Sequence, residues 1–134
     1  MARSETRVMT NTDPDFYQVV GPYLANRVVA KSLGGPIWDD PGKIWIVRQD
    51  GAGNLAGFIA VTDRGKVESL YTAPGRHELR AALVQAAVDA AGDRDLNAVV
   101  SHSRVTAYTA AGFTETSRST NFTTLHRPAQ ESTP

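Results

Sequence analysis

The 134-residue sequence contains no cysteine, which excludes a thiol nucleophile and any metal site with thiolate ligands. No window approaches the roughly 18 apolar residues of a membrane-spanning helix. The first seven residues also lack the apolar region of a signal peptide. We therefore expect a cytoplasmic protein with no membrane partner.

An excess of one charge is also absent, because 14 basic residues balance 14 acidic ones. A general nucleic-acid binder presents a basic surface, so this balance disfavours a nucleic-acid partner, although a local basic rim stays open. The sequence has no Gly-x-Ser-x-Gly elbow and no P-loop. No group of His, Asp and Glu has metal-ligand spacing, so we expect no metal.

The length, with 41% hydrophobic and 21% charged residues, suits one globular domain. We place this domain at residues 1–127. Residues 128–134 are polar and flanked by prolines, which predicts a flexible C-terminal tail.

Helices and one short strand are predicted in the first third of the chain. Residues 7–10 have the pattern of a strand, and Asp13 with Pro14 is typical of a helix start, as N-cap and first residue. Pro22 interrupts the apolar face of this helix and is expected to kink or split it. A second short helix is predicted over residues 25–33.

The middle of the chain predicts three strands, then a helix and a further strand. Strands over residues 43–48, 55–62 and 66–72 are separated by tight turns, which predicts an antiparallel meander. An Ala- and Leu-rich helix over residues 78–91, closed by Gly92, then leads to a short buried strand at residues 98–100. A strand, a crossover helix and a strand imply a parallel pair.

A short helix over residues 103–111 and a hairpin of residues 113–119 and 122–126 complete the order. The expected class is α+β, with a mixed, mostly antiparallel sheet of about six to seven strands flanked by about four helices.

Two motifs carry a resemblance to a known family. Residues 67–74 read Val-Glu-Ser-Leu-Tyr-Thr-Ala-Pro, and residues 107–113 read Ala-Tyr-Thr-Ala-Ala-Gly-Phe. With the element order between them, they resemble the fourth strand and the Tyr-x-x-x-Gly-Phe element of the GNAT superfamily of acyl-CoA-dependent N-acyltransferases. The resemblance implies a GNAT-like fold and acetyl-CoA as the acyl donor.

Catalytic roles follow from this resemblance. It implies that Tyr108 is the general acid that protonates the CoA thiolate, and that backbone N–H groups of Leu70, Tyr71 and Thr72 hold the acyl oxygen. Glu68 is the candidate base, and strand alternation predicts that it shares a face with Leu70 and Thr72. The alternatives are a Tyr108 packed under the hairpin, a solvent-facing Glu68, and a water chain as the base.

The stretch over residues 75–80 departs from the family. GNAT proteins normally carry an Arg/Gln-x-x-Gly-x-Gly loop, whose backbone N–H groups cradle the CoA pyrophosphate at a helix start. Here the stretch reads Gly-Arg-His-Glu-Leu-Arg, with Glu78 where a phosphate would be received. The side chains of Arg76, His77 and Arg80 are the candidate phosphate ligands in its place.

Candidate residues for the acceptor lie in two loops. Trp38 and Asp39, with Asp40, offer a π-face and negative charge to a cationic amine. His102 is a third candidate for substrate binding, and a solvated loop role is the alternative for all of them. The resemblance implies a small-molecule or protein amine as the acceptor. It also implies that a homodimer can form through the C-terminal strands, which often pair between subunits in this fold.

Three functions are compatible with these observations. The leading one is an N-acetyltransferase that transfers an acetyl group from acetyl-CoA to a primary amine. The second is a non-catalytic GNAT-like binding module that has lost CoA binding, as the shortened loop suggests. The third is a GNAT-related transferase that modifies nucleic-acid bases.

Overall fold

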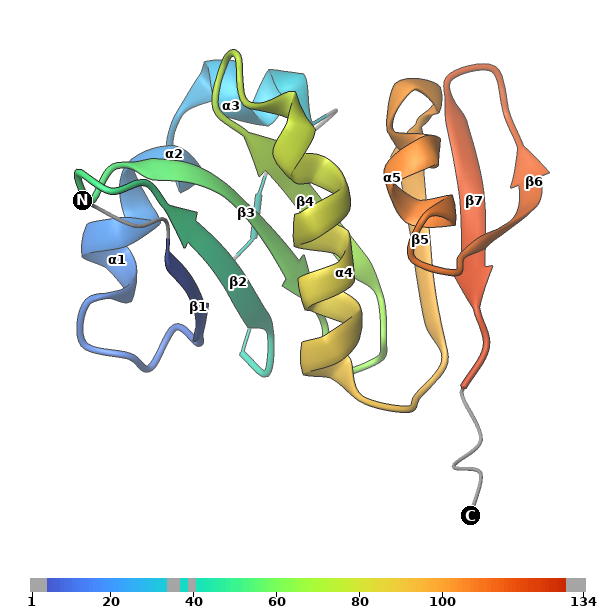
Figure 1. The fold of residues 1–134 in the computed structure, drawn as a ribbon, viewed down its shortest axis with the longest axis horizontal. Coiled ribbons are helices and arrows are strands. Elements are labelled where there is room, and N and C mark those ends of the chain that lie inside the picture. The colour runs from blue at the N-terminus through green and yellow to red at the C-terminus, as the bar shows by residue number, and fades with distance from the viewer. Residues whose placement is uncertain (1–4, 34–36, 39–40, 130–134) are drawn as a thin grey trace.

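Two antiparallel sheets form the computed structural model, which describes residues 5–33, 37–38 and 41–129 (Figure 1). The first sheet has the order β1-β2-β3-β4, with β1 (Glu5–Met9), β2 (Ile44–Gln49), β3 (Leu55–Val61) and β4 (Val67–Thr72). The second has the order β5-β7-β6, with β5 (Leu96–Ser101), β6 (Thr114–Arg118) and β7 (Phe122–Arg127). The predicted α+β class and the mostly antiparallel pairing are confirmed.

The helices divide between the two faces of the molecule. Within the described residues they are α1 (Phe16–Val19), α2 (Gly21–Leu24), α3 (Arg27–Ser32), α4 (Arg80–Ala91) and α5 (Val105–Thr109). Short 3₁₀ turns precede α4 at His77–Leu79 and α5 at His102–Arg104. Figure 1 shows α4 in front of the first sheet and α5 in front of the second.

The start of the first helix differs from the prediction. Helix α1 begins at Phe16, so Asp13 and Pro14 are not its N-cap and first residue. The Asp13 carboxylate instead accepts a hydrogen bond from the Thr10 N–H at 2.7 Å, which closes the turn after β1. The predicted split at Pro22 is confirmed, because α1 ends at Val19 and Pro22 lies in the first turn of α2.

The predicted parallel pairing of β4 with β5 is reduced to one contact. A single parallel bridge joins Lys66 to Asn97, and beyond it the two strands belong to separate sheets. The crossover helix α4 does bring β4 and β5 together at one end, as its length and position predict. Strand β5 is also longer than expected, and its residues are buried on one face only.

Two apolar cores cover opposite faces of the first sheet. One lies under α4 and α5 and includes Leu83 and Leu96, and the other lies under α1–α3. Phe16, Trp45 and Phe58 are fully buried in the second core, with ring centroids 5.5–5.6 Å apart. Burial of each such side chain stabilises the fold by about 1.5–3 kcal/mol.

Gly57 in the middle of β3 sets the distance between the first sheet and α4. A Cβ atom at this position would lie 2.7 Å from the Tyr71 carbonyl oxygen and 2.8 Å from Cδ1 of Leu83. Both distances are too short for a side chain, so the glycine permits the close approach of α4. This packing places the start of α4 beside the end of β4.

Candidate functional site

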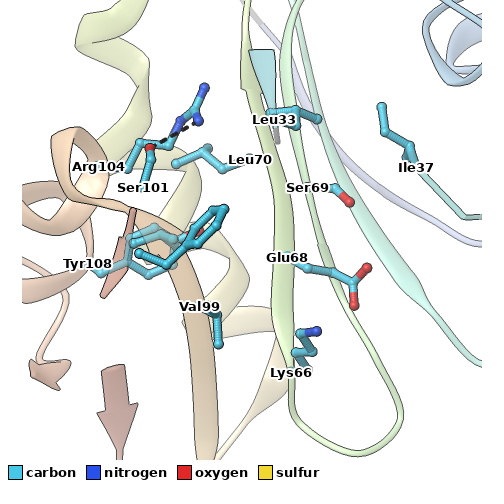
Figure 2. A pocket seen from close by; sticks show the side chains of 12 residues that line it. Leu33, Ile37, Lys66, Glu68, Ser69, Leu70, Val99, Ser101, Arg104 and Tyr108 are labelled. Atoms are coloured by element: carbon cyan, nitrogen blue, oxygen red, sulfur yellow. Dashed lines mark hydrogen bonds between the residues drawn. The ribbon is translucent and has the colours of Figure 1, made fainter. Parts of the chain in front are cut away.

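A pocket opens where β4 and β5 separate, and it reaches from one face of the first sheet to the other. Figure 2 shows residues of β4, β5 and α5 around it, together with Leu33 just after α3. About 680 Å³ of space, part of it open to solvent, lies between its walls. Twelve residues line it: Leu33, Ile37, Lys66, Glu68, Ser69, Leu70, Val99, Val100, Ser101, Arg104, Tyr108 and Phe122.

A β-bulge in β4 shapes one wall of this pocket. Phe58 pairs with Tyr71 and Ala60 with Glu68, so two residues of β4, Ser69 and Leu70, stand opposite one residue of β3. Ser69 has φ 61°, a left-handed conformation that a serine adopts only at a cost. The extra residue bends the strand away from β5.

The bulge overturns the predicted face of Glu68. Leu70 packs in the core under α4, whereas Glu68 points to the opposite face (Figure 2). Simple alternation had predicted one shared face for these residues, but the left-handed Ser69 between them reverses the pattern. Glu68 and Leu70 therefore line opposite ends of the pocket.

Backbone N–H groups near the end of β4 point away from β3 only at alternate residues. The Ala73 N–H donates to the Ala56 carbonyl on β3 at 2.8 Å. In an antiparallel ladder, the N–H groups of Tyr71 and Ala73 then point to β3, and those of Leu70 and Thr72 point to the side of β5. This alternation narrows the predicted oxyanion donors to Leu70 and Thr72.

Tyr108 of α5 is fully buried at the wall formed by the second sheet. Its ring packs edge-on against Phe113 with centroids 5.4 Å apart, which the Tyr-x-x-x-Gly-Phe spacing produces. Its hydroxyl is buried and has no hydrogen-bond partner among the described residues. Burial raises the pKa of Tyr108 well above its ordinary value, so the phenol stays protonated at neutral pH and can donate a proton or hydrogen bond.

Glu68 is held by a buried lysine that the sequence analysis did not identify. Lys43 is 2% exposed, and its Nζ lies 3.2 Å from Oε2 of Glu68, whose side chain is 25% exposed. The same Nζ donates to the Trp38 carbonyl and lies 5.3 Å from the centroid of the Trp45 ring. Lys43 thus joins β4 to the segment before β2 and fixes one carboxylate oxygen of Glu68.

The three predicted phosphate ligands differ in their surroundings. Arg76 Nε pairs with Oε1 of Glu78 at 3.0 Å, and His77 is exposed. A hydrogen bond from the backbone N–H of Glu78, followed by the contact with Arg76, lowers the pKa of the Glu78 carboxyl. Arg80, at the first residue of α4, is half-buried and makes no such ion pair among the described residues.

Arg104 is a further basic residue at this end of the pocket. It is half-buried, and its Nη1 lies 3.5 Å from Oγ of Ser101. Burial lowers the pKa of Arg104, and the nearby charge of Arg80 lowers it further. Two guanidinium groups whose charges act on each other favour a bound anion.

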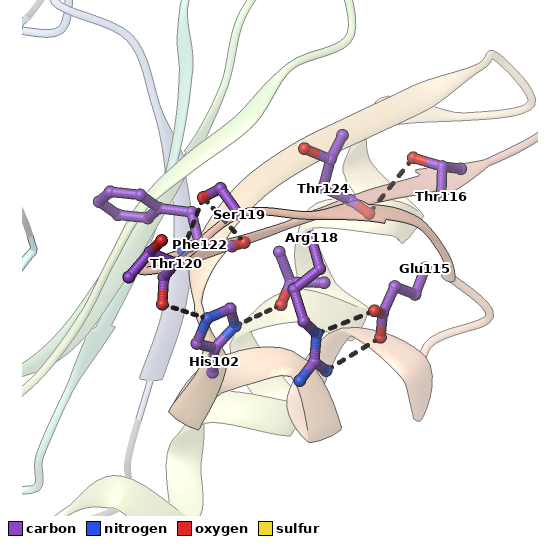
Figure 3. Close-up of polar contacts among 9 residues, drawn as sticks. His102, Glu115, Thr116, Arg118, Ser119, Thr120, Phe122 and Thr124 are labelled. Carbon is purple, nitrogen blue, oxygen red and sulfur yellow. Dashed lines mark hydrogen bonds and ion pairs between the residues drawn. The ribbon is translucent and has the colours of Figure 1, made fainter.

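His102 makes structural hydrogen bonds on both ring nitrogens (Figure 3). Nε2 lies 3.0 Å from the Thr120 carbonyl oxygen and must donate to it, since a carbonyl only accepts. Nδ1 lies 2.7 Å from Oγ1 of Thr123, a fully buried threonine of β7. His102 therefore ties the start of α5 to the hairpin, and in this arrangement it offers no ring nitrogen to a substrate.

The predicted acceptor residues are only partly described. Trp38 is exposed, and its carbonyl rather than its ring makes the contact with Lys43. Asp39 and Asp40 lie outside the described residues. The neighbouring Ile37 and Leu33 line the pocket instead, although no pattern in the sequence had marked them.

No group of three His, Cys, Asp or Glu residues is arranged to hold a metal ion in the described ranges. None of the helices in that part of the chain is long and apolar enough to cross a membrane.

Solved structures with the same architecture are acyltransferases, whereas no protein-family model and no curated protein sequence matches the chain. Spermidine N-acetyltransferase from Vibrio cholerae, solved with CoA and spermine, has a TM-score of 0.64 at 13% identity, over 92% of this chain and 94% of that chain. The GNAT phosphinothricin acetyltransferase from Sinorhizobium meliloti, in complex with acetyl-CoA, has a TM-score of 0.63 at 20% identity, over 94% and 88%.

FeeM, an N-acyl amino acid synthase from uncultured soil microbes, has a TM-score of 0.66 at 13% identity, over 96% of this chain and 92% of that chain. The chain therefore has the fold of the GNAT acyltransferases.

Proposed function

We propose that this protein is an N-acetyltransferase that transfers an acetyl group from acetyl-CoA to a primary amine of a small molecule or protein. The observation that carries the proposal is the Tyr108 hydroxyl, which is fully buried beside the pocket without a hydrogen-bond partner among the described residues. A buried hydroxyl that makes no hydrogen bond costs free energy. A partner supplied by the bound thioester would offset this cost.

The residues on the two walls fit the chemistry of thioester aminolysis. The N–H groups of Leu70 and Thr72 hold the carbonyl oxygen as it becomes negatively charged. The protonated phenol of Tyr108 reprotonates the sulfur when the C–S bond breaks. Glu68, on the other face, receives the proton of the attacking ammonium, directly or through water, while Lys43 keeps its carboxylate in place.

The start of α4 fits the phosphates of CoA through side chains in place of a glycine loop. Arg80 and Arg104 supply two guanidinium groups next to the pocket, and each can bind phosphate with two N–H groups. His77 is exposed near the same helix start and completes the set. Arg76 contributes less to phosphate binding, because its guanidinium group pairs with the Glu78 carboxylate.

A second candidate is a GNAT-like module that binds a partner without catalysis. The observation in its favour is the same helix start, where the Arg76–Glu78 pair places a carboxylate near the position of the pyrophosphate. The two candidates differ in their response to acetyl-CoA. Only the enzyme releases free CoA thiol in the presence of an amine.

The test is a thiol-release assay with acetyl-CoA and a panel of primary amines. We expect amine-dependent release of CoA, and we expect Tyr108→Phe to lower kcat by about 100-fold while affinity for CoA changes little. Tyr17→Phe is the matched control, because this exposed tyrosine of α1 lies outside the pocket. Equal turnover in the two variants would remove Tyr108 from the mechanism.

A further inference from the structure

The acceptor end of the pocket is apolar on two opposite sides. Leu33 and Ile37, from the end of α3 and the segment before β2, form one side. Val99 of β5 and Phe122 of β7 form the other, and they are 52% and 38% exposed. The pocket therefore gathers two of the large hydrophobic side chains that this protein exposes.

Strand geometry places Val99 and Phe122 on the same side as Glu68. Ala98 and Val100 belong to the core under α4 and α5, so Val99, between them, emerges on the opposite face. Ser101 pairs with Phe122 and Val99 with Thr124, so Phe122 lies on the same face as Val99. The ring of Phe122 points away from His102 (Figure 3). Glu68 also points to this face.

The charges at this end suit a single ammonium group. Glu68 is the one carboxylate among the described residues that line the pocket, and one of its oxygens is already bound to Lys43. Two cations also line the pocket, with Lys66 next to Glu68 and Arg104 at the opposite end (Figure 2). An amine that carried several positive charges would find only one described partner here.

We propose that the acceptor is a small primary monoamine with an apolar body, whose nitrogen meets Glu68 and whose body lies between Ile37 and Phe122. This inference rests on the proposed function and names the class of its second substrate. In the reaction, the ammonium first loses one proton and its nitrogen then bonds to the acetyl carbon. As the C–S bond breaks, the nitrogen loses its second proton to solvent, and the thiolate takes up a proton from Tyr108, which yields an N-alkylacetamide and CoA.

The test compares two amines of equal size. Hexylamine and 2-(2-aminoethoxy)ethanol have the same number of heavy atoms, but the second has an ether oxygen in place of one CH₂ group and a hydroxyl in place of the terminal CH₃ group. With the full-length protein and acetyl-CoA, we expect kcat/KM to be at least about tenfold higher for hexylamine. Equal values, or a higher value for the ether or for spermidine, would overturn the inference.

Two variants test whether the preference for an apolar amine arises from the side of the pocket that Val99 and Phe122 form. Val99→Thr keeps the shape of the side chain and should lower kcat/KM for hexylamine by about threefold, with little change for the ether. The matched control is Val8→Thr, since Val8 is 60% exposed on β1 and lies outside the pocket. An equal effect of both substitutions, or none from Val99→Thr, would overturn the assignment.

Binding of acetyl-CoA separates failure of this inference from failure of the proposed function. If acetyl-CoA binds and the polar amines are acetylated better, only the inference fails. If acetyl-CoA does not bind, the proposed function fails and the inference fails with it. A dimer that dissociates on Phe122→Ser would show that Phe122 is a subunit contact, and this too would overturn the inference.

Discussion

At the scale of single residues, Tyr108 combines a predictable position with an environment that only the fold reveals. The Tyr-x-x-x-Gly-Phe spacing places it before the turn at Gly112 and against Phe113. The complete burial of its side chain depends on a core that also includes residues of α4 and of the first sheet, which are far away in the sequence. Local sequence patterns therefore predict Tyr108 as a site residue, but they do not predict the burial that raises its pKa.

The pH dependence of stability tests the burial of this phenol. Because burial raises the pKa of Tyr108 above its ordinary value of 10.0, the unfolded chain ionises first as the pH rises. The stability that the neutral phenol contributes is therefore complete below pH 10 and is lost above it. We expect the difference in free energy of unfolding between wild type and Tyr108→Phe to stay constant up to about pH 9.5 and to fall at higher pH. A fall already between pH 7 and 9 would contradict this burial.

Lys43 and Glu68 form a second residue-scale feature that sequence patterns did not mark. A lysine at the start of a strand is typical of a solvent-exposed position, yet Lys43 is almost fully buried. We expect Lys43→Met to lower the free energy of unfolding by about 3 kcal/mol, because it leaves the Trp38 carbonyl and the Glu68 carboxylate without their donor.

A double-mutant cycle measures how strongly this pair is coupled. Lys43→Met combined with Glu68→Gln should cost less than the sum of the two single changes, by more than 1 kcal/mol. The exposed pair of Arg118 and Glu115, at 3.0 Å, is the matched control and should show about 0.2–1 kcal/mol. Similar coupling in both pairs, measured by urea unfolding, would contradict the buried geometry.

At the scale of elements, the bulge at Ser69 decides which side chains enter the pocket. Alternation along residues 66–72 predicts a strand correctly, but it cannot reveal one inserted residue, because serine gives no signal for a left-handed conformation. Glu68 was therefore assigned to the wrong face. Gly and Asn, which adopt positive φ more readily, would have indicated the bulge.

Substitution by glycine should affect Ser69 and a regular strand residue in opposite directions. At Ser69, with φ 61°, Ser69→Gly should stabilise the protein by about 1 kcal/mol, because the left-handed strain disappears. At Thr124, in the central strand of the second sheet, Thr124→Gly should cost at least about 0.5–1 kcal/mol. Equal destabilisation by the two changes in denaturant unfolding would argue against the bulge.

Local sequence patterns predicted some of the other elements correctly and missed others. The Ala- and Leu-rich stretch of α4 and the split at Pro22 were predicted, because composition and a missing N–H act locally. The helix start at Asp13 was wrong, since its carboxylate closes a turn with Thr10 instead. The divergence of β4 and β5 was not predicted either, because a crossover helix indicates neighbouring strands and not the length of their ladder.

At the scale of the whole molecule, the pocket exists because two sheets meet at one bridge. Lys66 and Asn97 join them, and Glu68, Tyr108 and Phe122 then approach the pocket from three separate strands or helices. The family resemblance predicted Tyr108 as a site residue, but not the divergence of the two sheets or the place of Phe122. The walls at Leu33, Ile37 and Val99 arise from tertiary contacts and were not predicted.

The basic residues at the start of α4 connect this architecture to the central proposal. Arg80 and Arg104 come from two helical segments that only the fold brings together. If they bind the phosphates of CoA, Arg80→Gln should weaken acetyl-CoA binding at least tenfold. Arg118→Gln, on the outer strand of the second sheet, should leave it unchanged. Equal affinities in the two variants would show that the phosphates bind elsewhere.

The most direct measurement is a calorimetric titration of the wild-type protein with acetyl-CoA, together with thermal unfolding at increasing ligand concentration. We expect saturable binding with one site per chain. We also expect an added stability of about 2.7 kcal/mol when the ligand is present at 100 times its Kd. Neither heat nor a shift in Tm at millimolar acetyl-CoA would contradict the proposal that this GNAT fold is an acetyl-CoA-dependent transferase.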